Sequence, residues 1–195
     1  MIKILTRFRA KIKKIIRPLV EKLALTGLEP NHVTILGLVV AFLTPLSVIY
    51  FGSLGYIVFV AISALLDALD GELARLKNRA SRLGAFLDSF SDRVSDVLYI
   101  YSLIYLGLSS DIVILLIVLS ILISYARARA EGLGISVEGV GLMERGERII
   151  ALILIAATAY FSKDLLLISS VVLVVLLIYT LLERVYRIMI ALRSV

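Results

Sequence analysis

The chain has 195 residues, of which 61% are hydrophobic, and its formal net charge is +6 at pH 7. This composition is far more apolar than that of a soluble domain and indicates a single integral membrane domain, all-α, over residues 1–195. The absence of cysteine excludes disulfides and thiolate metal sites, and nothing around the one histidine, His32, suggests a zinc site or a Ser-His-Asp triad.

Residues 2–25 alternate basic and apolar side chains at a helical period. Eight basic residues fall between Lys3 and Lys22, against one acidic residue, Glu21. The pattern predicts an amphipathic helix that lies in the membrane interface and is kinked or split at Pro18. Because the basic residues flank apolar segments, we expect membrane lipid headgroups or phosphorylated substrates as partners, and no nucleic acid.

A bundle of six transmembrane helices is predicted within residues 32–188. Clusters of turn-forming residues separate the apolar segments, and the proline inside the first segment is tolerable in a membrane helix. The predicted spans are residues 32–51, 55–75, 84–107, 111–131, 146–161 and 165–188.

Basic residues are distributed unevenly between the two sides that six crossings create. The three joints on one side carry one basic residue, Lys163, whereas the other twenty of the 21 lysines and arginines lie on or near the opposite side. The positive-inside rule then puts both termini and the loops of residues 76–83 and 132–145 in the cytoplasm. We therefore expect a multi-pass protein of the cytoplasmic membrane.

Four aspartates lie inside the apolar segments at helical spacing. Asp67 and Asp70 share one face of the second predicted span, and Asp88 and Asp92 share one face of the third. An ionised carboxylate near hydrocarbon is costly and usually marks a functional site. If the two faces meet, the four residues form an aspartate cluster at the cytoplasmic ends of the spans, suited to hard cations such as Mg²⁺.

The residues around these aspartates suit phosphoryl transfer. Two divalent ions held ~4 Å apart by shared carboxylates can clamp a diphosphate and stabilise attack at phosphorus. Arg75 offers a positive fork for a phosphate. Gly71, Ala74 and Gly84 leave room on their helices for a ligand or a neighbouring backbone. Asp92 is a candidate to accept the proton of an incoming hydroxyl.

Residues 67–92 follow the pattern D-x-x-D-G-x-x-A-R, eight residues, then G-x-x-x-D-x-x-x-D. This string resembles the signature of the CDP-alcohol phosphotransferase family at every defining position, and the similarity extends over most of the chain, including residues 30–37. It implies a six-helix membrane enzyme, often a homodimer, with two divalent ions per site, usually Mg²⁺ or Mn²⁺. A hydroxyl then attacks the lipid-side phosphorus of CDP-diacylglycerol or CDP-archaeol, CMP leaves, and the active site faces the cytoplasm.

The same resemblance implies roles for individual residues. Asp67, Asp70 and Asp88 are expected to be metal ligands. Asp92 is expected to be both a ligand and the general base. The expected CDP-lipid-binding residues lie before the first span, around the aspartates and in the following loop: Asn31, His32, Val33, Thr34, Gly71, Ala74, Arg75, Ser81 and Gly84.

Two downstream stretches, residues 125–132 and 143–148, resemble the branch of the family that accepts inositol phosphate, the phosphatidylinositol phosphate and archaetidylinositol phosphate synthases. An acceptor that carries its own phosphate needs a basic pocket, and arginine suits phosphate. Arg127 stands where these synthases tend to carry lysine, and Gly146 where they often carry proline. The expected acceptor-binding residues are Arg127, Arg145 and Arg148.

Other interpretations stay open. Within the family, the acceptor is glycerol phosphate or another alcohol, or CDP-inositol is used to make di-inositol phosphate phosphate. Outside it, intramembrane carboxylates suit a divalent-cation transporter, although the far side carries only Asp111, Lys163 and Asp164 and so lacks a pathway. A non-catalytic lipid-binding scaffold gives no reason for Asp92. We expect Asp96, on the same face, to pair with Arg93 or another span.

Overall fold

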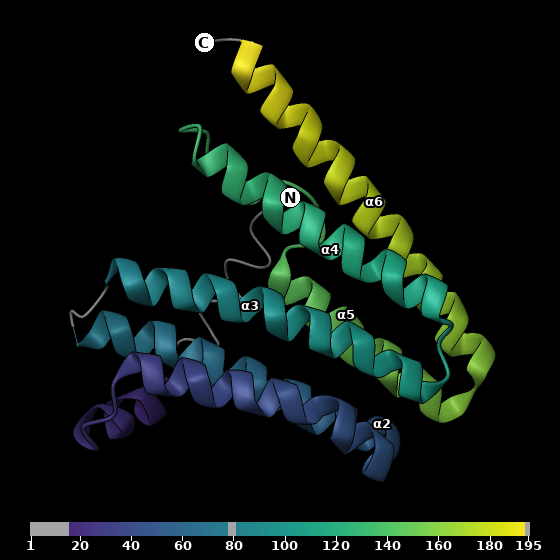
Figure 1. Ribbon diagram of the computed structural model, residues 1–195, viewed down its shortest axis with the longest axis horizontal. Coiled ribbons are helices and arrows are strands. Elements are labelled where there is room, and N and C mark those ends of the chain that lie inside the picture. The colour runs from purple at the N-terminus through teal and green to yellow at the C-terminus, as the bar shows by residue number, and fades with distance from the viewer. Residues whose placement is uncertain (1–15, 78–80, 194–195) are drawn as a thin grey trace.

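The computed structural model describes residues 16–77 and 81–193, and every regular element in these ranges is a helix (Figure 1). The predicted all-α class is therefore confirmed. Residues 16–25 form a short first helix, whereas residues 2–15 of the predicted amphipathic helix lie outside the described residues. The later helices are α2 (Pro30–Leu76), α3 (Arg82–Ser102), η1 (Leu103–Leu106), α4 (Ser110–Glu131), α5 (Arg145–Phe161) and α6 (Lys163–Arg193).

The long helix α2 is a hairpin of two antiparallel helices joined at Gly52. The backbone there leaves the helical region, with φ 58° and ψ −142°, a positive φ that favours glycine. Close contacts pair the two halves: a Cβ on Gly55 would overlap the carbonyl oxygen of Ser47, and the Ser63 hydroxyl donates to the Gly37 carbonyl at 2.6 Å. The break matches the predicted boundary between the first two spans.

Three helices, α2, α4 and α6, are long and apolar enough to cross a membrane. In the most apolar stretches of α4 and α6 only 28% of the residues are buried inside the molecule. Aliphatic surface of this extent suits lipid rather than water, so the chain is a multi-pass membrane protein. α3 carries several charged residues and α5 has 17 residues, so neither meets the same criteria of length and composition.

The connections between the helices gather at the two ends of the bundle. In Figure 1 the bend of α2, the junction of α3 with α4 and the turn between α5 and α6 lie at one end. The C-terminal end of α2, the N-terminal end of α3 and the linker of residues 132–144 lie away from that end. This up-and-down course is the one expected from six crossings, whose number nevertheless remains a prediction.

A column of buried polar groups ties α2 to α3 just below the aspartates. Tyr99 is fully buried, and its hydroxyl donates to the Ser63 oxygen at 2.7 Å. Ser63 in turn donates to the Gly37 carbonyl, so one chain of hydrogen bonds crosses three helical segments. Because Ser63 lies one helical turn before Asp67, this chain fixes the height and rotation of the helix that bears the first two aspartates.

The short helix of residues 16–25 packs against the back of the same segment of α2. Ile16 and Val20 form a small hydrophobic core with Val33, Leu69 and Leu73. Its polar face is exposed, with an ion pair of 2.9 Å between residues 17 and 21. The helix is therefore amphipathic over the residues described, while its position in the membrane interface remains a prediction.

The linker of residues 132–144 is anchored on α6. The backbone N–H groups of residues 142 and 143 donate to the Thr180 hydroxyl oxygen at 3.3 and 3.2 Å. Gly141 has φ 98° and lies against Thr180, where a Cβ would overlap the threonine side chain. The linker thus delivers the chain to the start of α5 at a defined place.

Candidate active site

The facing ends of α2 and α3 bring three of the four predicted aspartates together. One carboxylate oxygen each from Asp67, Asp70 and Asp88 lies within 4.8 Å of the other two. α3 begins six positions after the last residue of α2, so the end of one helix lies near the start of the other. Three convergent carboxylates are the donor set that hard divalent cations prefer, and these residues therefore fit such an ion.

Asp70 is held by the first half of α2. Its carboxylate is buried and accepts a hydrogen bond from the Thr34 hydroxyl. Nearby, Ser81 begins α3 as its N-cap and accepts the Gly84 N–H at 2.9 Å. A Cβ on Gly84 would lie 3.4 Å from the Asn31 side-chain oxygen. Four of the predicted CDP-lipid-binding residues thus gather at the same end of the helices as the aspartates.

Two other residues of that predicted set have structural partners. His32 belongs to a capping box at the start of α2, where its Nδ1 accepts the Glu29 N–H at 3.4 Å. Val33 is buried in the small core behind the aspartates. The N-terminal end of α2 therefore reaches the aspartates through Thr34, not through these two side chains.

Arg75 lies on the exposed surface one turn after Gly71. Its Nε donates to the Gly71 carbonyl at 3.1 Å, and its Nη2 approaches the Glu72 carboxylate at 3.5 Å. A Cβ on Gly71 would lie 3.4 Å from the Arg75 guanidinium, an ordinary van der Waals contact, so this fold of the arginine does not itself require glycine. Ala74 is half-buried on the same helix.

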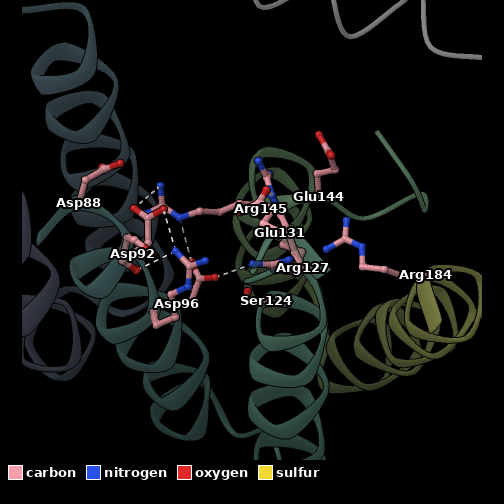
Figure 2. Close-up of a pocket in the computed structure, with 12 residues that line it drawn as sticks. Asp88, Asp92, Asp96, Ser124, Arg127, Glu131, Glu144, Arg145 and Arg184 are labelled. Atoms are coloured by element: carbon pink, nitrogen blue, oxygen red, sulfur yellow. Dashed lines mark hydrogen bonds and ion pairs between the residues drawn. The ribbon is translucent and has the colours of Figure 1, made fainter. Parts of the chain in front are cut away.

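Asp92 is not part of this group of three carboxylates, and it faces Arg145 at the start of α5 (Figure 2). The Arg145 Nη1 lies 2.8 Å from the Asp92 Oδ1, an ion pair without hydrogen-bond geometry. The same nitrogen donates to the Asp67 Oδ2 at 2.6 Å. Arg145, expected to bind the acceptor phosphate, is thus engaged with two aspartates of the cluster.

Asp96 forms an ion pair with another predicted span, α5, as one of the two expectations for it stated, and does not pair with Arg93. Its Oδ2 accepts a hydrogen bond of 2.7 Å from Arg148, and both side chains are buried. The Nε of Arg145 approaches its other oxygen at 3.4 Å. Arg93 instead donates to the Ser89 carbonyl at 2.7 Å. Asp96 therefore fixes the start of α5 against α3.

A cavity of about 340 Å³ opens beside these ion pairs, among α3, α4, α5 and α6 (Figure 2). Asp88, Asp92 and Asp96 lie on one side of it, and Arg184 lies on the other. All three predicted acceptor-binding arginines line this cavity. Its basic lining consists of Arg93, Arg127, Arg145, Arg148 and Arg184.

Arg184 is the lining residue that the sequence reasoning missed. It is only 3% exposed, and its guanidinium donates to the carbonyls of Ile123 and Val140 at 3.0 and 2.9 Å. In the described part of the chain it forms no ion pair, and its Nε has no hydrogen-bond partner. The sequence signal was weak, because Arg184 stands beside Glu183 at the polar end of a long apolar run, where basic residues commonly face headgroups. By contrast, Arg127 pairs with Glu131 at 2.8 Å.

Comparison with known proteins agrees with this geometry. The model of the CDP-alcohol phosphatidyltransferase family matches residues 28–192. The archaetidylinositol phosphate synthase of Aeropyrum pernix is 38% identical over 156 residues, which cover 80% of this chain and 80% of that protein.

Solved structures of the phosphatidylinositol phosphate synthase of Mycobacterium tuberculosis are similar to the whole bundle. The structure with CDP-DAG bound superposes with a TM-score of 0.71 at 29% identity, over 90% of this chain and 94% of that one. The structure in complex with manganese and citrate gives 0.69 at 29% identity, over 88% and 87%. From the match over residues 28–192 and the identity to the Aeropyrum synthase, this chain belongs to the CDP-alcohol phosphatidyltransferase family.

Proposed function

We propose that this CDP-alcohol phosphotransferase is a membrane phospholipid synthase whose acceptor is inositol 1-phosphate. It transfers the phosphatidyl or archaetidyl group of a CDP-linked lipid to a hydroxyl of the acceptor and releases CMP. The observation that carries the proposal is the contact between an aspartate cluster and a cavity lined by five arginines. The named relatives, which are synthases, give no support to a cation transporter.

The acidic side of the site suits the CDP-lipid. Asp67, Asp70 and Asp88, with Asp92 as a further ligand, would hold two Mg²⁺ or Mn²⁺ ions. Bound there, the ions supply positive charge that neutralises the diphosphate and makes its phosphorus more electrophilic. The side chains that would receive the rest of the nucleotide gather nearby: Asn31, Thr34, Gly71, Ala74, Arg75, Ser81 and Gly84.

The basic side of the site suits an acceptor that carries a phosphate. A volume of about 340 Å³ lies in the range of small-molecule pockets and admits one sugar-sized ligand. Arg184 is buried without a carboxylate partner among the described residues, so an anion in the cavity would complete its interactions. A neutral alcohol leaves that charge unmatched.

The reaction then needs a base at the boundary between the two sides, and Asp92 stands there. The acceptor oxygen attacks the lipid-side phosphorus, the bond from that phosphorus to the CMP oxygen breaks, and the hydroxyl proton passes to the Asp92 carboxylate. Its location on the cavity wall, one turn after Asp88, supports this assignment.

The arrangement in the membrane follows from the same features. We infer six crossings, with the α2 hairpin counted as two, and lengths of about 33 and about 36 Å for its two halves, close to the thickness of the bilayer core. The basic loops and the aspartates share one end of the bundle, which supports a cytoplasmic site and cytoplasmic termini. A homodimer is also proposed, from the family resemblance alone.

The test is the release of CMP by the purified protein in Mg²⁺. CDP-archaeol and CDP-diacylglycerol are each supplied with inositol 1-phosphate, inositol or glycerol 3-phosphate. We expect release with inositol 1-phosphate and loss of release in chelator or in Asp70→Asn. Faster release with glycerol 3-phosphate or with inositol would overturn the acceptor assignment, and the two lipids identify the donor.

A further inference from the structure

Arg145 lies within the aspartate cluster, although it also lines the adjacent cavity. Its Nη1 is 2.6 Å from one oxygen of Asp67 and 2.8 Å from one oxygen of Asp92. In the part of the chain that the structure describes, Asp70 and Asp88 form no ion pair. Among the described residues, the Arg145 guanidinium thus pairs with Asp67 and Asp92, whereas Asp70 and Asp88 have no cationic partner.

A divalent cation and this guanidinium compete for the same space. A Mg²⁺ ion sits about 2.1 Å from each oxygen ligand, closer than an arginine nitrogen can approach. An ion bound by the same two oxygens, Asp67 Oδ2 and Asp92 Oδ1, would therefore compete with the Arg145 Nη1 for them. An ion bound only by Asp67, Asp70 and Asp88 does not need Asp92 as a ligand, because the carboxylates of these three residues already lie close together.

We propose that Arg145 is a built-in counter-cation, which leaves the Asp67–Asp92 pair when a divalent cation binds there and turns into the cavity toward the acceptor phosphate. This inference rests on the proposed function. In this role Arg145 is a positioning residue: it keeps two like-charged carboxylates together before metal binds and becomes an anion ligand afterwards.

The neighbouring arginine shows why Arg145 is the one that moves. Arg148 is buried, with a bond of 2.7 Å to Asp96, and has no second carboxylate. The Arg145 side chain is 22% exposed, and its Nε lies 3.4 Å from Asp96. The two Nη atoms can therefore change position while the Nε stays near the Asp96 carboxylate. The two partners of the Arg145 side chain, the Asp67–Asp92 pair and the acceptor phosphate, define the two states of the exchange.

The exchange couples two binding events. Metal frees Arg145 for the phosphate, and a phosphate in the cavity holds Arg145 away from the metal ligands. By linkage, each ligand tightens the other by the same factor. Asp67 and Asp92 therefore bind the metal most readily when an acceptor phosphate occupies the cavity.

The first test measures Mn²⁺ binding to the purified full chain in lipid nanodiscs, by the electron paramagnetic resonance signal of free Mn²⁺, with neither substrate present. Arg145→Gln should tighten Mn²⁺ binding about tenfold, within the usual range of coupling between sites. Arg93→Gln is the matched control, because Arg93 also approaches Asp92, at 3.6 Å, and lines the same cavity. Equal tightening in both variants, or none in Arg145→Gln, would overturn the proposal.

The second test needs no variant. Phenylglyoxal modifies accessible arginines, and peptide mass spectrometry reports the modified fraction at Arg145 with and without Mn²⁺. We expect modification to rise severalfold with Mn²⁺ and to fall again when inorganic phosphate is added, while buried Arg148 stays constant. Unchanged or reduced modification of Arg145 in saturating Mn²⁺ contradicts the exchange.

Failure of this inference can be told apart from failure of the proposed function. Both tests omit the CDP-lipid, and neither measures CMP. A protein that shows the exchange but releases no CMP with inositol 1-phosphate would refute the function alone. A protein that releases CMP while Arg145 stays unresponsive to Mn²⁺ would refute the exchange alone.

Discussion

The two sides of the candidate site differ in charge and in how the chain builds them. The acidic side comes from residues 67–92, on the successive helices α2 and α3. Apart from Arg93 of α3, the arginines of the basic side come from residues 127–184, on α4, α5 and α6. In the proposed function, binding of the diphosphate depends on a compact, local motif, whereas recognition of the acceptor depends on the packing of three helices. Variants on the two sides should therefore fail in different ways.

The largest effect is expected on the acidic side. Asp70→Asn keeps the shape of a buried side chain but removes a negative metal ligand, so CMP release should fall about 10³-fold or more with every acceptor. Retention of the thermal midpoint would separate this effect from unfolding. Activity above a tenth of the wild-type value would contradict the assignment of Asp70.

The next effect is on stability and concerns the ion pair between Arg148 and Asp96, which joins α5 to α3. Arg148→Ala leaves buried Asp96 with only the longer contact of 3.4 Å to Arg145, which should cost about 3 kcal/mol, the lower end of the range for a broken buried ion pair. The thermal midpoint in detergent should fall accordingly, and the double variant Asp96→Leu, Arg148→Met should recover much of it. If Arg148→Ala changes only the KM for the acceptor, the ion pair is not structural.

A smaller effect, confined to the acceptor, should follow from changes on the basic side. Arg184→Gln removes one charged hydrogen-bonding group, worth about 1.5–3 kcal/mol, so the KM for inositol 1-phosphate should rise roughly 10- to 100-fold. The KM for the CDP-lipid should stay within twofold, because the acidic side is untouched. A parallel rise in both constants would place Arg184 outside the acceptor pocket.

These two sides were not equally predictable. The four aspartates and the break at Gly52 follow from local spacing and from glycine conformation, so the sequence was sufficient for them. The partners of Arg145 were not predictable, since Arg145 and Asp67 are 78 positions apart and meet only through the packing of α5 on α2. Arg184, beside Glu183 at the polar end of the last apolar run, was counted only toward topology.

The smallest effect should refine the acidic side itself. Thr34→Val removes the hydroxyl that donates a hydrogen bond to Asp70. Because such a hydrogen bond contributes about 1 kcal/mol, the affinity for Mn²⁺ should change by roughly fivefold at most. The KM for the acceptor should not move. A loss as large as that of Asp70→Asn would mean that Thr34 is itself a ligand.

The most direct measurement is anomalous X-ray diffraction from crystals of the protein grown with Mn²⁺ and inositol 1-phosphate. The account predicts manganese among Asp67, Asp70 and Asp88, and phosphate density against Arg184 in the cavity of about 340 Å³. Manganese away from these carboxylates, or phosphate bound outside the arginine-lined cavity, would contradict it.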